Sequence, residues 1–289
     1  YGLRCVVALR LPAAAHPALF ADPGAWQGLL DRWESIAKRY HDAPELLSYD
    51  LLDHPTAPDT LPPEALTALG AARVSPAAAR RPALPGATAA RAWNALAAKL
   101  TNAIRAHDDR HTIVIQSHEA SPAAFTHLRP TRDPNTLYSF HCFDPRAFTQ
   151  QGLVGQEPIE RGLGDQNAAG QVAPVPYPGT IDGERWDRAR LQELLGPALE
   201  FRRVYEAPVY VGAFGVAGGA PRAGQLTWLR TVLSLCRAHG LGWAYWTYKG
   251  GPFGLAADRS SASADIRQER YGNPMGLDYD LLGILQGEA

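Results

Sequence analysis

Titratable side chains recur directly after apolar runs in this sequence. Asp53 and His54 follow the run "ELLSYDLL", and His118 and Glu119 follow "HTIVIQS". Carboxyl and imidazole groups that share a site can serve as general acid and base, and an unperturbed histidine changes charge in the neutral range. If the chain is an active enzyme, Asp53, His54 and Glu119 are therefore its candidate catalytic residues.

Two further groups of this kind come later in the chain. His141 lies near the end of "NTLYSFHCF" with Asp144 just beyond it, and Trp246 and Tyr248 end the run "LGWAYWTY". Residues two apart point to the same side of a strand, so Trp246 and Tyr248 share one face, opposite to Trp243 and Tyr245. An indole at a strand end can pack in the core or stack on a ligand, so Trp246 has two possible roles.

The same histidines allow a metal site as an alternative. His54, His118 and His141, together with Glu119, offer the nitrogen and oxygen ligands that suit zinc or iron(II). They stand far apart in the sequence, so no ligand spacing supports the idea. We therefore predict no metal ion and no cofactor.

Strand-like and helix-like segments alternate along the chain. The apolar runs predict strands at 3–11, 45–52, 111–117, 135–143, 207–216 and 241–248, and apolar stripes at helical spacing predict helices at 26–40, 93–104, 186–205, 226–236 and 279–286. Residues 56–88 are rich in Pro and Ala and predict a long connection of low order. The Gly- and Pro-rich stretch 151–184 predicts a long loop with a binding role.

This alternation predicts an α/β protein with a parallel sheet. No glycine-rich turn of a dinucleotide fold is present, since the glycines of "VGAFGVAGG" lack its spacing. The polar groups gather at the carboxyl ends of strands, where (β/α)8 barrels assemble their sites. The predicted fold class is therefore a (β/α)8 TIM barrel.

Bulk properties exclude some partners. The 289 residues are 46% hydrophobic with a formal net charge of -1, so the chain can bury a large core and has no basic footprint for nucleic acid. No apolar run is long enough for a transmembrane segment. The three cysteines lack metal-finger spacing, and their apolar surroundings predict buried side chains. The oligomeric state is left open.

Four segments resemble glycoside hydrolase family 5, the cellulase-type family of clan A. "WESIAKRYHDAPELLSYDLLDHP" resembles the family's helix 3 and strand 4, "TLYSFHCFDPRAFTQQG" its strand 6, "YPGTIDGERWDRARLQELLGPALEFRRVYEAPVYVGAFGV" its helix 6 through strand 7, and "GLGWAYWTYKG" its strand 8. The four occur in the family's order. In this register the first predicted strand is the family's third, so we expect one barrel domain over residues 1–289 that lacks the first two strand–helix units.

The resemblance also implies several losses. His54 stands at the family's acid/base glutamate and Ala213 at its nucleophile glutamate, while Asp53 replaces an asparagine, Arg10 a histidine and Phe143 a tyrosine. His141 and Trp246 match the family. Trp246 matches its subsite tryptophan, on which a sugar ring stacks, so the resemblance favours that role for Trp246 over a role in the core. An alanine at a nucleophile position is also a common laboratory substitution, but the simultaneous departures favour natural divergence.

Three functions follow from the resemblance. The leading hypothesis is a family member that has lost the retaining mechanism, which needs two carboxyl groups about 5–5.5 Å apart, and that binds a saccharide or related ligand. Its ligand-binding candidates are Arg10, His118, His141, Phe143, Trp246 and Tyr248. The alternatives are an active enzyme, hydrolytic or metal-assisted, that uses re-purposed Asp53, His54, Glu119 and His141, and a non-catalytic scaffold in a polysaccharide or biosynthetic complex. The resemblance implies a carbohydrate or small-molecule ligand as the partner. It favours a secreted or periplasmic location without fixing it.

Overall fold

The computed structural model describes residues 2–71, 86–153, 174–256 and 276–287. Its main sheet has the strand order β1-β2-β3-β4-β7-β8, and the pairs β1–β2, β2–β3 and β3–β4 are parallel. These strands are β1 (Cys5–Ala8), β2 (Leu46–Asp50), β3 (Thr112–Gln116), β4 (Thr136–Cys142), β7 (Val209–Phe214) and β8 (Gly242–Tyr245). The predicted fold class is confirmed, since these parallel strands with helical crossovers belong to the (β/α)8 class.

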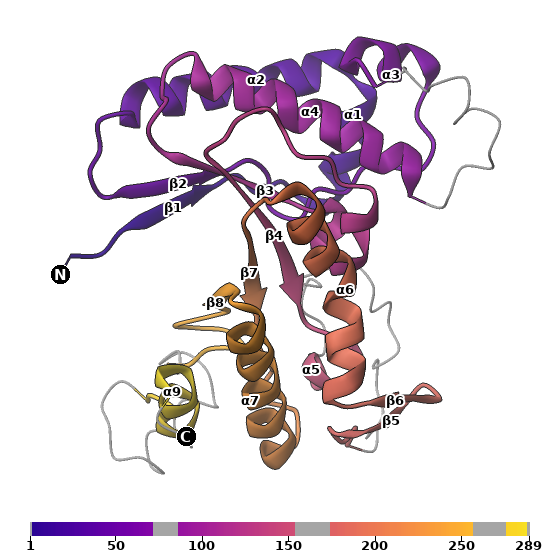
Figure 1. The fold of residues 1–289 in the computed structure, drawn as a ribbon, viewed down its shortest axis with the longest axis vertical. Coiled ribbons are helices and arrows are strands. Elements are labelled where there is room, and N and C mark those ends of the chain that lie inside the picture. The colour runs from indigo at the N-terminus through magenta and orange to yellow at the C-terminus, as the bar shows by residue number, and fades with distance from the viewer. Residues whose placement is uncertain (1, 72–85, 154–173, 257–275, 288–289) are drawn as a thin grey trace. The chain divides into compact units, whose positions relative to one another are not determined.

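Helices alternate with these strands along the chain (Figure 1). They are α1 (His16–Ala21), α2 (Pro23–Tyr40), α3 (Pro63–Leu69), α4 (Ala87–Arg105), α5 (Arg146–Thr149), α6 (Arg188–Tyr205), α7 (Arg222–His239) and α9 (Tyr279–Gln286), with 3-10 turns η1 (Ala13–Ala15), η2 (His118–Ala120) and η3 (Pro122–Thr126). The five predicted helices correspond to α2, α4, α6, α7 and α9. Within the part of the chain that the structure describes, no helix is long and apolar enough to cross a membrane.

The chain divides into two compact units. Unit 1 comprises Tyr1–Phe140 and Gly196–Tyr210, and unit 2 comprises His141–Leu195 and Val211–Ala289. The expected single domain over residues 1–289 stays a prediction.

Two buried tryptophans connect helices to strand ends in unit 1. Trp33 of α2 packs edge-on against Tyr49 of β2, and its Nε1 donates to the carbonyl oxygen of Leu51 at 3.0 Å. Trp93 of α4 donates from Nε1 to the carbonyl oxygen of Gln116 at 2.7 Å. Both side chains are fully buried. The helical stripes predicted from the sequence therefore hold the carboxyl ends of β2 and β3 in place.

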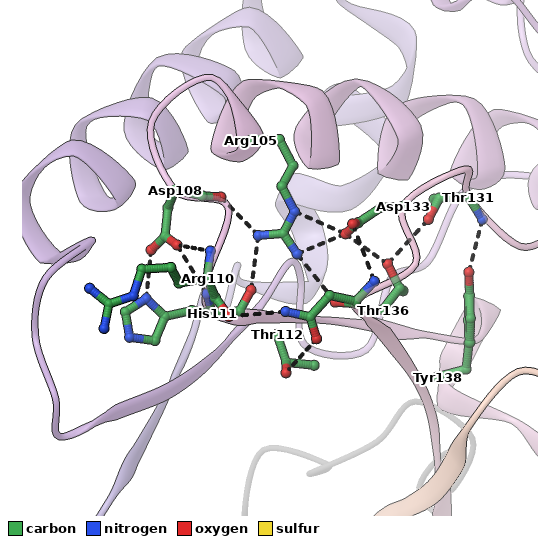
Figure 2. Close-up of polar contacts among 10 residues, drawn as sticks. Arg105, Asp108, Arg110, His111, Thr112, Thr131, Asp133, Thr136 and Tyr138 are labelled. Atoms are coloured by element: carbon green, nitrogen blue, oxygen red, sulfur yellow. Dashed lines mark hydrogen bonds and ion pairs between the residues drawn. The ribbon is translucent and has the colours of Figure 1, made fainter.

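A polar network holds the opposite end of these strands (Figure 2). Asp108, which follows α4, accepts hydrogen bonds from Tyr49 Oη at 2.7 Å and from the backbone N–H of His111 at 3.0 Å, and its Oδ2 lies 2.6 Å from His111 Nδ1. Arg105 donates to Asp133 Oδ2 from Nε and Nη2 at 3.0 and 2.8 Å. Burial acts to raise the pKa of Asp108, but the hydrogen bonds from His111, Tyr49 and Arg110 outweigh it and lower the pKa to about 2.

Unit 2 has its own apolar core around β7. Phe214 packs edge-on against Trp243 and Tyr245 of β8, and Trp228 of α7 lies on the same ring. The Nε1 of Trp228 donates to the carbonyl oxygen of Asp144 at 2.9 Å. The expectation that Trp243 and Tyr245 share one strand face is confirmed.

Two connections contain more structure than the sequence predicted. Helix α3 lies within 56–88, and α4 begins at residue 87; a proline at the start of α3 and Gly70 at its end in the left-handed region bound the short helix. Strands β5 (Gly179–Ile181) and β6 (Glu184–Trp186) form an antiparallel hairpin inside the predicted loop 151–184. The predicted loop role of residues 154–173 lies outside the described residues.

Candidate functional site

The end of β2 carries the first group of predicted site residues. Asp53 Oδ2 lies 3.6 Å from Arg10 Nε, and the backbone N–H of Asp53 donates to the carbonyl oxygen of Leu9 at 2.7 Å. The Asp53 side chain is 24% exposed and that of Arg10 is 56% exposed. The structure therefore brings Arg10 and Asp53 together as a half-exposed ion pair beside β1.

His54 has an unusual backbone conformation. Its φ of 56° lies in the left-handed region, where non-glycine residues are uncommon. Its backbone N–H donates to Gln116 Oε1 at 2.9 Å, and its carbonyl oxygen accepts from Thr56 Oγ1 at 3.0 Å. The chain thus turns sharply at His54 while both its backbone polar groups stay satisfied.

His118 and Glu119 meet the segment that follows His54. The backbone N–H of Glu119 donates to the carbonyl oxygen of Pro55 at 2.7 Å, and His118 Nε2 lies 3.0 Å from both the N and the O of Ala57. The Glu119 side chain is exposed. These two predicted residues therefore contact the segment at Pro55 and Ala57, His118 through its ring and Glu119 through its backbone.

Asp50, Gln116 and Tyr210 were not selected from the sequence, but Gln116 and Tyr210 each interact with Asp50 and with Asp53. Gln116 is 3% exposed, and its Nε2 donates to Asp50 Oδ2 at 2.8 Å and to Asp53 Oδ1 at 3.3 Å. Burial, followed by the negative charge of Asp50, raises the pKa of Tyr210 in β7 above its ordinary value. The Tyr210 hydroxyl is therefore protonated and within electrostatic range of Asp50. The one available signal was a polar Gln that closes the apolar run "TIVI".

Unit 2 contains the remaining predicted residues. His141 lies edge-on to Phe143, with ring centroids 6.2 Å apart, and Phe143 belongs to an apolar cluster with Ala213, Ala217 and Phe253. Ala213 is 6% exposed within this cluster. The Ala213 side chain therefore lies among apolar groups.

Trp246 and Tyr248 lie on the exposed side of the chain after β8. Trp246 is 37% exposed and Tyr248 56% exposed. The backbone N–H of Trp246 donates to the carbonyl oxygen of Phe214 at 2.9 Å. A side chain at Gly215 would collide with the carbonyl oxygen of Trp246, so glycine permits the close approach of the two segments.

The metal alternative gains no support from these contacts. Within residues 2–71, 86–153, 174–256 and 276–287, no group of three or more His, Cys, Asp or Glu side chains could hold a metal ion. His118 instead contacts backbone atoms of Ala57.

Parallel strands with helical crossovers, and polar and aromatic side chains at their carboxyl ends, define the class of (β/α)8 barrel proteins. The sequence model of the family described as "Cellulase (glycosyl hydrolase family 5)" matches residues 22–251. The chain belongs to this family.

Several known proteins are similar to this chain in sequence or in fold. The chain is 24% identical to Endoglucanase C of Acetivibrio thermocellus over 269 residues, covering 86% of this chain and 67% of that protein. Endoglucanase Cel5A of Thermotoga maritima is similar in structure, with a TM-score of 0.66, 22% identity and coverage of 97% of this chain and 71% of that one. The clostridial cellulose synthase subunit Z (CcsZ) of Clostridioides difficile gives a TM-score of 0.67 at 18% identity, covering 97% and 73%.

Proposed function

We propose that this family member does not run the retaining hydrolytic mechanism and that it binds a saccharide or a related ligand. The observation that carries the proposal is the environment of Ala213. By the sequence resemblance, Ala213 stands where the family has its nucleophile glutamate. A methyl group can neither attack an anomeric carbon nor stabilise the positive charge of the transition state.

The apolar cluster around Ala213 supports the same proposal. Phe143 and Phe253 are each 2% exposed and Ala217 is fully buried. Phe143 stands at a family tyrosine, so the side chain offers no hydroxyl at this position. Burying a carboxylate without hydrogen-bond partners is costly, and the side chains of Phe143, Ala217 and Phe253 offer no such partner.

His54 gives a second, independent support. It stands at the family's acid/base position with an imidazole in place of a carboxyl group, and its backbone is held by Gln116. Asp53, one residue earlier, interacts with both Arg10 and Gln116.

Ligand binding is supported by groups suited to a sugar. The half-exposed carboxylate of Asp53 can accept hydrogen bonds from hydroxyl groups. The exposed indole of Trp246 offers a flat apolar face, on which the C–H face of a sugar ring can stack.

A mechanism-based trap tests the loss of the nucleophile. The purified chain is incubated with a 2-deoxy-2-fluoro β-cellobioside bearing a good leaving group, and its intact mass is measured. We expect no added mass, with a family 5 endoglucanase as the positive control. A stoichiometric glycosyl adduct that maps to one carboxylate would overturn the proposal.

A glycan array run in parallel tests binding. An array on which the protein shows no affinity for any glycan would favour the scaffold hypothesis instead.

A re-purposed enzyme is the second candidate, and one observation favours it. Asp50 and Asp53 are bridged by a single amide of Gln116, and both carboxylates act electrostatically on the Tyr210 hydroxyl. Paired titratable groups in different environments are a common basis of acid and base roles. Turnover that needs Asp53, in the absence of any trapped adduct, would support this candidate.

A further inference from the structure

Gln116 has a bridging position that the sequence analysis did not anticipate. It is the last residue of β3, and its side chain contacts Asp50 on β2, Asp53 beyond the end of β2, and the backbone of His54. One side chain therefore connects the strand end that carries two of the predicted site residues to the neighbouring strand.

The neighbours of Gln116 determine how its amide is oriented. The backbone N–H of His54 can only donate, so it requires the oxygen Oε1, at 2.9 Å. The carboxylates of Asp50 and Asp53 accept hydrogen bonds, so they require the two protons of Nε2, at 2.8 and 3.3 Å. A glutamate could not replace this arrangement at neutral pH, because its carboxylate would face two others without a proton to donate.

The Gln116 side chain constrains both the backbone of His54 and the carboxylate of Asp53. Left-handed backbone is unfavourable for a non-glycine residue, and at His54 the hydrogen bond to Gln116 offsets part of that cost. The same amide holds one oxygen of Asp53, which leaves Oδ2 on the side of Arg10. Asp50 is only 5% exposed and holds Gln116 from the buried side.

We propose that Gln116 is the positioning residue of this strand end, and that Asp50 holds it in place. In this role Gln116 orients the Asp53 carboxylate and the His54 turn toward the hydroxyl groups of a saccharide. The saccharide part of the inference rests on the proposed function, whereas the positioning of His54 and Asp53 does not.

Two variants separate positioning from simple packing. Gln116→Leu keeps a similar volume and removes all three hydrogen bonds. Gln116→Glu keeps the shape, adds a charge at pH 7, and regains one donor when its carboxyl group is protonated. Asn94→Leu is the matched control, because Asn94 also bridges a carbonyl and an N–H, those of His127 and Arg129, but on α4.

The first measurement is amide hydrogen exchange at His54, which needs no ligand. We expect exchange to become at least tenfold faster in Gln116→Leu, and faster in Gln116→Glu at pH 7 than at pH 5 after correction for intrinsic exchange rates. Asn94→Leu should leave it unchanged. Unchanged protection of His54 in a folded Gln116→Leu protein would overturn the proposal.

The second measurement is the affinity for cellotetraose, used as the probe, across the same pH range. We expect about tenfold weaker binding or more in Gln116→Leu at every pH, and binding by Gln116→Glu that recovers on acidification relative to the wild type. If the wild type binds neither cellotetraose nor any arrayed glycan, the proposed function fails while the exchange result still decides the role of Gln116. Equal binding by the wild type and both variants would overturn the positioning role.

Discussion

Arg10 Nε lies 3.6 Å from Asp53 Oδ2, so the segments that follow β1 and β2 are joined by an ion pair. The sequence resemblance predicts that Arg10 takes the place of a family histidine and Asp53 that of an asparagine. In that register a pair of opposite charges stands where the family has two neutral or titratable groups. This pairing is consistent with natural divergence of the strand end and gives the first prediction.

The Arg10–Asp53 pair should contribute little to stability. Both side chains are partly exposed, and exposed ion pairs are typically worth about 0–1 kcal/mol. A double-mutant cycle of Arg10→Gln and Asp53→Asn, followed by urea unfolding, should give a coupling energy below about 1 kcal/mol. A much larger coupling would mean that the pair is a structural element and not part of a ligand-facing surface.

Placing a carboxylate at position 213 should destabilise the protein. Ala213→Glu would bury a charge beside Phe143 and Phe253, and we expect the free energy of unfolding to fall by about 3 kcal/mol or more. Ala213→Gln, which has the same shape and no charge, separates desolvation of the charge from overpacking. The Ala213→Glu variant alone should also remain without glycosidase activity. Full stability together with recovered hydrolysis would contradict our reading of this cluster.

The two exposed tryptophans of the β8 region should behave differently. Trp243 is 40% exposed and packs on Phe214, whereas Trp246 is 37% exposed and is our candidate for stacking on a sugar. Trp246→Ala should therefore weaken glycan binding with little effect on the melting temperature. Trp243→Ala should lower the melting temperature and leave binding unchanged. Calorimetric titration of both variants with the glycan selected by the array provides the comparison, and the reverse outcome would assign the ligand contact to Trp243.

Asp108 should govern part of the acid stability. Its pKa is lowered from 3.8 to about 2 in the folded protein, so its contribution is fully present above about pH 4 and is lost as the pH falls toward 2. The shift in pKa corresponds to about 2 kcal/mol of folding free energy.

The Asp108→Asn variant should be less stable than the wild type at pH 7, and its unfolding free energy should fall less steeply between pH 4 and pH 2. Asp109→Asn, an exposed neighbour, is the control. Parallel pH profiles for the wild type and Asp108→Asn would refute the assignment.

The sequence predicted the fold well because apolar spacing is a local property. The stripes through Trp33 and Trp93 identified α2 and α4, and the same residues hold the ends of β2 and β3. Helix α3 was missed because its Pro- and Ala-rich surroundings resemble a loop. The β5–β6 hairpin was missed although Asp182 and Gly183, both with positive φ, form a typical hairpin turn.

The site was less predictable because its contacts depend on strands that are distant in sequence. Asp53, His54 and Arg10 could be selected from the family pattern. Gln116 could not, since its importance arises only when β2 and β3 lie side by side. Glu119 was predicted from its residue type, and the structure adds a backbone contact to Pro55 that no sequence pattern indicates.

The most direct test of the central claim is a turnover assay of the purified chain. Aryl β-cellobiosides and soluble β-glucan are supplied from pH 4 to pH 9, and the wild type is compared with His54→Ala. We predict that neither protein exceeds the uncatalysed rate at any pH. Turnover that co-purifies with the wild type and disappears in His54→Ala would contradict the account.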